Sequence, residues 1–390
     1  MAQAYIAAVA RSAGGKRGGR LAGVHPADLG GRVLAALVAR SGIDPAAVED
    51  VVMGCACPGG EQGANIARNA VLAGGLPESV PGTHVDRQCG SSQQALHFAA
   101  ATVMAGIQDV VIAAGVESMT RVPMGLPWTL AAKHGFGTYR SPGIEARYPD
   151  TPFSQFGGAE MLARKYGLTR DMLDAYALDS HRRAAAAVQG GKFDAEIVPL
   201  DVVSAEGEAM VHAVDEGIRF DATLERIASV KLLTEGGVIT AANASQICDG
   251  AAALLVVNEA GLKAHGLTPL ARIHQMTVLG HDPVIMLEAP IPATRRALAK
   301  AGMQMGDIDL YEVNEAFAPV PLAWAQAMEA DPARMNVHGG AIALGHPLGG
   351  SGAKLMATLV SALHDRGARY GLQTMCEAGG MANVTIIERL

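Results

Sequence analysis

The sequence of 390 residues has few aromatic side chains, no long apolar run and no excess of positive charge. Its longest apolar stretch, residues 251–257, is far shorter than the roughly 18 to 20 residues that cross a bilayer. No membrane span is therefore expected. The formal net charge of −7 provides no general basic surface for nucleic acid, which is excluded as an expected partner.

Cysteine is also sparse. The five cysteines are widely spaced, and their odd number does not suit the disulfide framework of a small secreted domain. Cys55 and Cys57 lack a second Cys/His pair at zinc-finger spacing, so no metal site is predicted. The N-terminus places apolar residues before basic ones, the reverse of a signal peptide. We expect a cytoplasmic protein, with an organellar transit peptide as the weaker alternative because residues 4–9 have the pattern of a strand.

What the sequence does contain is glycine, 47 residues of it, and a 49% hydrophobic fraction that relies on small side chains. This composition is typical of layered α/β structure. Hydrophobic spacing predicts a helix over 29–40, a strand over 48–54, a helix over 93–105 and a strand over 110–114. A similar series follows near the end: a glycine-rich turn at 345–352, a helix over 353–364 and a strand over 372–376. The two series indicate a weak internal duplication.

The segment between the two series differs in composition. It is richer in Pro, Tyr, His and charge, holds one predicted helix over 171–188, and begins with residues 123–152, which are expected to be mostly loop. The strand predicted over 251–257 then returns to the first half. The predicted domains are residues 1–120 plus 248–269, an inserted loop domain over 121–247, and residues 270–390.

Cys89 lies where a strand is expected to turn into a helix. Free backbone N–H groups and the helix dipole favour a thiolate at such a position, which makes Cys89 a candidate nucleophile. A buried cysteine that packs as a small hydrophobic side chain is an equally good interpretation of this segment alone.

Three further segments contain candidate catalytic residues. His346 lies in a glycine-rich turn before the second predicted helix, the counterpart of the position of Cys89. Cys376 ends an apolar strand and precedes a turn whose amides suit an oxyanion. Asn314 follows the strand predicted over 310–313, where it is either a site residue or a helix cap.

Taken together and in this order, these segments resemble the thiolase family. The resemblance rests on DRQCGSSQQALH (86–97), NEAF (314–317), GGAIALGHP (339–347) and CEAGG (376–380), which extend over most of the chain. The first of these and the segment 245–251 resemble degradative bacterial thiolases most, among them those of sterol side-chain breakdown. The resemblance implies two duplicated α/β halves with an inserted loop domain over the active site.

It also implies a reaction: acyl transfer between CoA and a 3-ketoacyl-CoA, with cleavage to acetyl-CoA and a shortened acyl-CoA, reversible as a Claisen condensation. By resemblance Cys89 is the nucleophile, His346 its base and Cys376 the general acid and base. The resemblance also implies two oxyanion holes: His346 and a water held by Asn314 form the first, and the backbone N–H groups of Cys89 and Ala378 form the second. Ala378 stands where the family commonly has Gly, and His338 where many members have Asn.

CoA is the co-substrate that the resemblance implies, with no tightly bound cofactor. The positions assigned to CoA binding are Ser245, Arg219, Gln155 and Phe317. Gln155 begins a segment that often reads His-Met-Gly in the family, which indicates a changed acyl pocket. The family also implies a homodimer or homotetramer.

Two alternatives remain open. A decarboxylating ketoacyl synthase uses a Cys-His-His set and lacks a second catalytic cysteine, which the NEAF and CEAGG segments disfavour. A non-catalytic carrier of acyl-CoA or lipid on a thiolase scaffold predicts a damaged catalytic set, and here that set is complete.

Overall fold

A large mixed sheet, whose two ends repeat one strand order, organises the protein. The computed structural model describes residues 2–203 and 207–390. In the first half β3 pairs in parallel with β5, β5 pairs antiparallel with β9, and β9 pairs antiparallel with β1. The second half repeats this order: β11 pairs in parallel with β12, β12 antiparallel with β13, and β13 antiparallel with β10. β1 and β10 pair at Tyr5↔Arg272 and Ile6↔Ala271, which joins the two halves. The expected duplication is thus confirmed in the topology of the sheet.

The bounds of the elements in each half are as follows. The first half contains β1 (Tyr5–Ser12), β2 (Gly15–Lys16), α1 (Pro26–Ser41), β3 (Asp50–Gly54), α2 (Ile66–Ala73), β4 (Thr83–Val85), α3 (Ser91–Met104), β5 (Val110–Ser118), β9 (Cys248–Val257) and α9 (Glu259–His265). The second contains β10 (Ala271–Gly280), α10 (Pro290–Ala301), β11 (Leu310–Val313), α11 (Pro319–Met328), α12 (Ala341–Leu344), α13 (Ser351–Arg366), β12 (Tyr370–Glu377) and β13 (Met381–Arg389).

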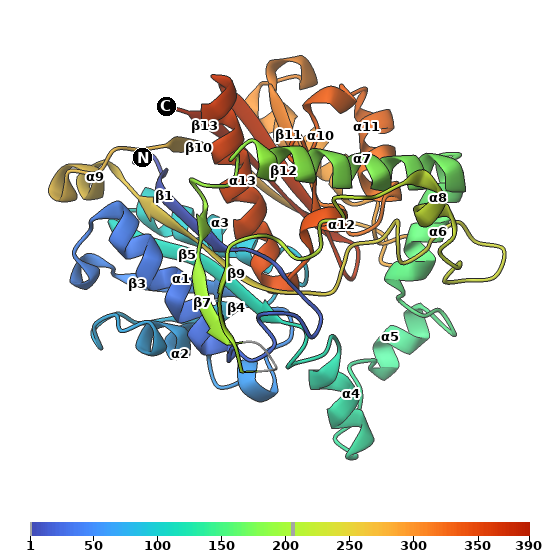
Figure 1. Cartoon of the computed structure of the whole chain (residues 1–390), viewed down its shortest axis with the longest axis horizontal. Helices are drawn as coiled ribbons and strands as arrows, with labels where there is room; N and C mark the ends of the chain where they lie inside the picture. The colour runs from blue at the N-terminus through green and yellow to red at the C-terminus, as the bar shows by residue number, and fades with distance from the viewer. Residues whose placement is uncertain (1, 204–206) are drawn as a thin grey trace.

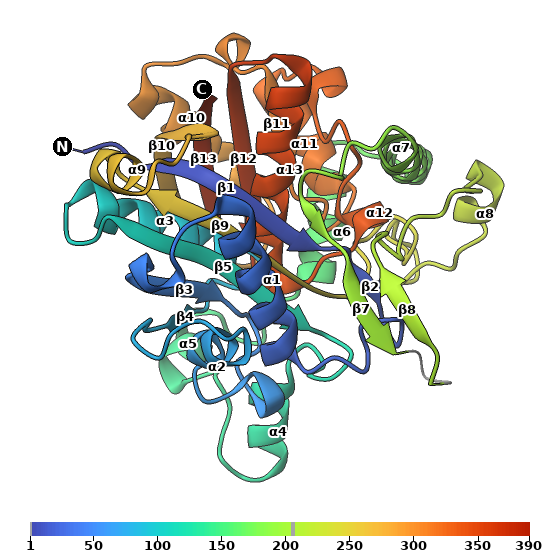
Figure 2. The ribbon, with the colours of Figure 1, turned by 60° about the vertical axis from the view of Figure 1, so that its left-hand side comes forward.

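Helices cover the sheet in layers (Figures 1 and 2). One hydrophobic core lies between α1, α2 and the first half of the sheet, and another lies among α10, α11 and the second half. A third contains residues of both α3 and α13 and of strands from both halves. Because both faces of β5 and β9 are covered, their residues are buried throughout, which explains their continuous apolar sequence.

The middle layer requires a close approach of α3 and α13. A side chain at Gly352, in the first turn of α13, would place its Cβ 2.2 Å from the backbone nitrogen of Gln93 in α3. Glycine is therefore needed where the helices meet. The amide of Ala353 also donates to the hydroxyl of Ser92 at 2.9 Å. These contacts bring the N-terminal ends of the two helices, and the turns before them, together.

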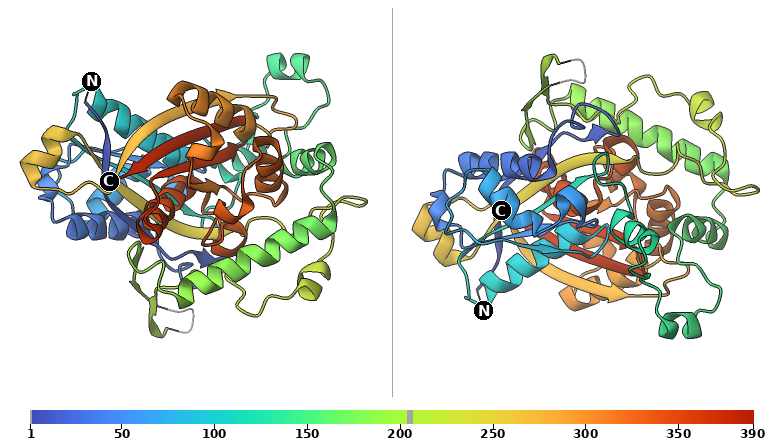
Figure 3. Two further views of the ribbon diagram at one scale, coloured as in Figure 1. Left: turned by 90° about the horizontal axis from the view of Figure 1, so that it is seen from above. Right: turned by 90° about the horizontal axis from the view of Figure 1, so that it is seen from below.

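The segment between β5 and β9 contacts both halves. It contains α4 (Leu126–Lys133), α5 (Pro142–Arg147), α6 (Gln155–Lys165), α7 (Arg170–Gln189), β6 (Ile197–Val198), β7 (Leu200–Val203), β8 (Ala209–His212) and α8 (Leu224–Ala228). α6 and α7 contribute to the core of the second half, while β7 contributes to the core of the first and β6 pairs with β1. Figure 3 shows α7 lying along the molecule and α4 at its margin. The interpretation of 123–152 as mostly loop was incomplete, because this stretch contains α4 and α5.

The two missed helices have a physical explanation. α4 and α5 each carry a proline in the first turn, where the absent N–H costs nothing. Ser141 also caps α5, accepting a hydrogen bond from the amide of Ile144 at 3.3 Å. No helix of the described residues is long and apolar enough to cross a membrane.

Candidate active site

Cys89 lies in the tight turn that leads into α3. The residue before it, Gln88, has a φ of 52°, in the left-handed region that side chains other than glycine rarely adopt. Ser91, the first residue of α3, stabilises this turn: its hydroxyl donates to the carbonyl of Gln88 at 2.5 Å and accepts from the amide of Arg87 at 2.9 Å. The nucleophile candidate is therefore held on a constrained backbone.

The thiol of Cys89 is buried, with 8% of the residue exposed. Burial raises its pKa well above the ordinary value, and the nearby Cys376 and Glu377 raise it further. The start of the helix was expected to favour a thiolate, but desolvation outweighs that effect. At neutral pH the group is a thiol, so it needs a base to react.

His346 is suited to be that base because it is neutral. Its side chain is buried, and burial followed by the charge of Lys354 lowers its pKa to about 3. Its Nδ1 atom lies 2.5 Å from the hydroxyl of Ser351, and its Nε2 atom lies 3.4 Å from the amide nitrogen of Asn314. The backbone nitrogen of His346 donates to the carbonyl of Gln246 at 3.0 Å, which anchors its turn.

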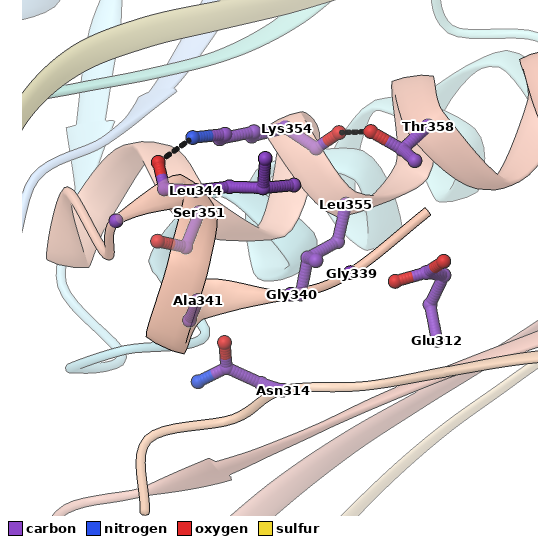
Figure 4. A pocket seen from close by; sticks show the side chains of 11 residues that line it. Glu312, Asn314, Gly339, Gly340, Ala341, Leu344, Ser351, Lys354, Leu355 and Thr358 are labelled. Atoms are coloured by element: carbon purple, nitrogen blue, oxygen red, sulfur yellow. Dashed lines mark hydrogen bonds between the residues drawn. The ribbon is translucent and has the colours of Figure 1, made fainter. Parts of the chain in front are cut away.

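Asn314 follows β11, and its backbone nitrogen donates a hydrogen bond to the carbonyl of Thr374 in the neighbouring strand at 3.0 Å. It does not cap a helix, since α11 begins later, at Pro319, after Ala318. Asn314, Ser351, Glu312 and Lys354 line a cavity of about 10 Å³. Figure 4 shows these side chains around it. The side-chain oxygen of Asn314 is buried there, while its nitrogen lies toward His346.

Cys376 lies near the end of β12 and is buried. Burial and the carboxyl group of Glu377 raise the pKa of this thiol to about 12. The turn that follows uses Gly379 and Gly380 for its left-handed backbone, with φ of 83° and 75°. Because Ala378 is not in that region, its methyl group causes no backbone strain, and it lines the same chamber as Cys89.

Two adjoining chambers open beside these residues. The first, which we name the Cys89 chamber, has a volume of about 240 Å³. The second, the His346 chamber, has about 110 Å³ and includes Ser245, Gln155 and Phe317. Met124, Gln155 and Leu348 line both. Three of the four residues assigned to CoA binding are therefore brought together with His346.

The fourth, Arg219, is exposed and is not among the residues that line either chamber. Its backbone nitrogen donates to the Nδ1 atom of His181 at 3.2 Å. His338 packs edge-on against Phe193, with ring centroids 5.9 Å apart. Among the described residues no cluster of His, Cys, Asp or Glu is arranged to hold a metal ion.

Sequence reasoning missed other parts of the site. It did not identify the side chains that wall the Cys89 chamber. They come from α4 and the turn before it, from the segment before α6 and from the loop before α10: Met124, Trp128, Phe153 and Met286. Sequence reasoning also assigned no role to Ser351, which lies in the glycine-rich turn predicted over 345–352. The only signal for Ser351 was its position as the first residue of a helix in the counterpart of the Cys89 turn.

The duplicated layered α/β scaffold thus brings together a buried thiol and a neutral imidazole, each at a turn before a helix, and a second buried thiol near the end of β12, groups that suit acyl transfer. The family pattern described as "Thiolase, N-terminal domain" matches residues 4–260, and "Thiolase, C-terminal domain" matches residues 267–389. The chain belongs to the thiolase family, as its motifs indicated.

Curated relatives match the chain over its whole length. It is 51% identical to the steroid 3-ketoacyl-CoA thiolase FadA6 of Mycobacterium tuberculosis, with 100% of this chain and 95% of the relative covered. It is 39% identical to the acetyl-CoA acetyltransferase of Cupriavidus necator, with 100% of both chains covered. The crystal structure of the Bacillus anthracis acetyl-CoA acetyltransferase has a TM-score of 0.91 at 37% identity, with 100% of this chain and 99% of that chain covered.

Proposed function

We propose that this protein is a thiolase that cleaves a 3-ketoacyl-CoA with CoA, through an acyl group carried on Cys89. The observation that carries the proposal is that Cys89 and His346, both buried, line adjoining chambers that share Met124, Gln155 and Leu348. Burial raises the pKa of the thiol and lowers that of the imidazole. A thiol in this state is inert without a base, and a neutral imidazole is that base. The membership of the thiolase family supports the same reaction.

In the first half-reaction, Nε2 of His346 takes the proton of the Cys89 thiol, and the sulfur attacks the 3-keto carbon. The bond between carbons 2 and 3 then breaks, and the acetyl-CoA enolate takes a proton from the thiol of Cys376. A pKa of about 12 suits Cys376 for this step, because the group remains a thiol until the strongly basic enolate forms.

In the second half-reaction, the thiolate of Cys376 takes the proton of an incoming CoA thiol. The CoA sulfur attacks the thioester on Cys89, the shortened acyl-CoA leaves, and Cys89 recovers its proton from His346. The backbone N–H groups of Cys89 and Ala378 are proposed to stabilise the tetrahedral oxyanion, and His346 with Asn314 the enolate oxygen.

The two chambers support an assignment of the substrate parts. We assign the CoA arm to the His346 chamber, where Ser245, Gln155 and Phe317 lie, with Arg219 near the nucleotide. We assign the acyl group to the Cys89 chamber. Among the described residues that line the Cys89 chamber none is charged, and its 240 Å³ exceed the roughly 150 Å³ of a cavity that takes benzene. The proposed substrate therefore carries a bulky apolar acyl group.

The test is the CoA-dependent loss of 3-ketoacyl-CoA enolate absorbance with short, long and sterol-derived substrates. We expect the highest kcat/KM for a bulky substrate. In Thr129→Phe, which adds volume to the chamber wall, kcat/KM for the bulky substrate should fall by roughly tenfold relative to acetoacetyl-CoA. Thr138→Phe, an exposed position after α4, is the matched control.

The outcomes separate the parts of the proposal. No cleavage of any substrate would disprove the thiolase assignment. Cleavage of acetoacetyl-CoA alone would leave the reaction intact and refute the bulky acyl group. The cytoplasmic location and the dimeric or tetrameric assembly stay predictions from the sequence.

A further inference from the structure

Two helices of the middle layer begin with a serine whose hydroxyl bonds back to the turn before it. In α3 the serine is Ser91, which donates to the carbonyl of Gln88 and accepts from the backbone amide of Arg87. In α13 it is Ser351, which donates to the carbonyl of Pro347 at 2.9 Å and lies 2.5 Å from Nδ1 of His346. The duplicated serine thus accepts from a backbone N–H in one half and faces the imidazole in the other.

The hydrogen atoms around Ser351 can be assigned from this geometry. A serine hydroxyl has one hydrogen, and that of Ser351 is directed to the carbonyl of Pro347. Its oxygen can therefore only accept from the imidazole. Nδ1 of His346 must carry the hydrogen, since two facing lone pairs 2.5 Å apart would repel each other.

The other ring nitrogen leads independently to the same conclusion. Nε2 of His346 faces the amide nitrogen of Asn314, a group that donates and does not accept. Figure 4 shows Asn314 and Ser351 on two elements around one cavity, Asn314 after β11 and Ser351 at the start of α13. A neutral imidazole between these partners has its free lone pair at Nε2.

We propose that Ser351 is a positioning residue that fixes His346 in the tautomer with hydrogen on Nδ1, so that Nε2 is free to take a proton. This rests on the proposed function for its catalytic consequence, although the tautomer itself does not depend on it. When Nε2 accepts the proton of the thiol, the imidazolium retains the same hydrogen bond from Nδ1 to Ser351. No ring rotation or tautomer exchange is then needed during turnover.

The rigid surroundings of Ser351 support this role. The residue is 2% exposed, and it begins α13, whose first turn is packed against α3. The backbone nitrogen of His346 is also anchored, to the carbonyl of Gln246. The imidazole and its acceptor are therefore both held by backbone that cannot easily move, which is the condition for a hydrogen bond to select one tautomer.

The direct test is a long-range proton–nitrogen NMR spectrum of ¹⁵N-histidine-labelled protein at neutral pH, with the His346 signals identified by their loss in His346→Gln. The expected spectrum has hydrogen on Nδ1 and a free Nε2. In Ser351→Ala the fraction with hydrogen on Nδ1 should fall and a mixture of the two tautomers should appear, because only the longer 3.4 Å contact with Asn314 then favours hydrogen on Nδ1. A wild-type spectrum with hydrogen on Nε2 would overturn the proposal even if the alanine variant failed to fold.

Kinetics give a second readout. Ser351→Ala should lower kcat by about tenfold to a hundredfold with a smaller change in KM, as loss of a residue that orients a reacting group typically does. Ser351→Thr retains the hydroxyl and should recover most of the activity. Ser361→Ala, whose hydroxyl on the same helix donates only to the carbonyl of Ala357, is the matched control.

The results distinguish this inference from the proposed function. If the wild-type protein cleaves no 3-ketoacyl-CoA, the function fails and the spectrum still decides the tautomer. If cleavage occurs but a folded Ser351→Ala protein retains the wild-type tautomer and kcat, Ser351 is not a positioning residue.

Discussion

At the scale of single residues, burial determines the protonation of the proposed site. His346 has a pKa lowered to about 3, so its neutral form is present above that pH and is lost only as the pH falls through it. An ordinary histidine, with a pKa of about 6.5, would lose its basic form under mildly acidic conditions. The hydrogen bond that Nδ1 makes with Ser351 does not by itself prevent protonation at Nε2; burial, followed by the charge of Lys354, disfavours it.

We therefore predict that kcat/KM for the 3-ketoacyl-CoA shows no acidic limb near pH 6.5 and remains within about twofold between pH 5.5 and 7.5. Initial rates measured over that range, with thermal unfolding at each pH as a stability control, provide the check. A fall of kcat/KM with an apparent pKa near 6.5 would mean that His346 is more hydrated than its burial indicates.

Residue types and their positions in the sequence were enough to select Cys89, His346, Cys376 and Asn314 as candidates. They were not enough to predict the ionisation of Cys89. The position of Cys89 before a helix predicted a thiolate. The pKa of the Cys89 thiol is instead raised, because it is buried beside Cys376 and Glu377, which are distant in sequence. Glu377 itself is buried, and its carboxyl packs against Gly90.

At the scale of elements, the approach of α3 to α13 determines whether the Cys89 and His346 turns meet. Gly352→Ala would force its Cβ against the backbone of Gln93, which cannot move as a flexible side chain can. We predict a loss of roughly 1 to 3 kcal/mol in the free energy of unfolding, as for an overpacked core. Urea unfolding measures it, with Gly280→Ala, where a Cβ meets open space, as the control. Equal stabilities of the two variants would show that the helices can separate.

The helices and strands were predicted best where the hydrophobic residues recur with a clear period. The helix expected over 353–364 lies within α13, and the strand expected over 310–313 coincides with β11. Prediction failed at α4 and α5, since proline and glycine were read as loop signals although proline also begins helices. The part of the chamber wall that α4 contributes was missed for the same reason.

At the scale of the whole molecule, the two halves share a core. Leu96 and Met356, from α3 and α13, are both 0% exposed and belong to one hydrophobic cluster. Separation of the halves would expose this cluster to water. The sequence indicated the duplication, but the mutual burial of α3 and α13 required three-dimensional information.

We predict a single cooperative unfolding transition for the chain, and no stable fold for residues 270–390 expressed alone. Circular dichroism and intrinsic fluorescence during urea unfolding should give coincident curves. Two separate transitions, or a folded C-terminal fragment, would favour independent domains over a shared core. The predicted domain bounds, with an inserted unit over 121–247, also stay to be tested by such fragments.

The central claim, that the acyl group passes through Cys89, is tested most directly by intact-protein mass spectrometry after brief mixing with a 3-ketoacyl-CoA in the absence of CoA. We predict a mass increase equal to the shortened acyl group, located by proteolysis on the peptide that contains Cys89, removed by added CoA and absent in Cys89→Ser. An acyl group on Cys376 instead, or CoA-dependent cleavage that survives in Cys89→Ser, would contradict the account.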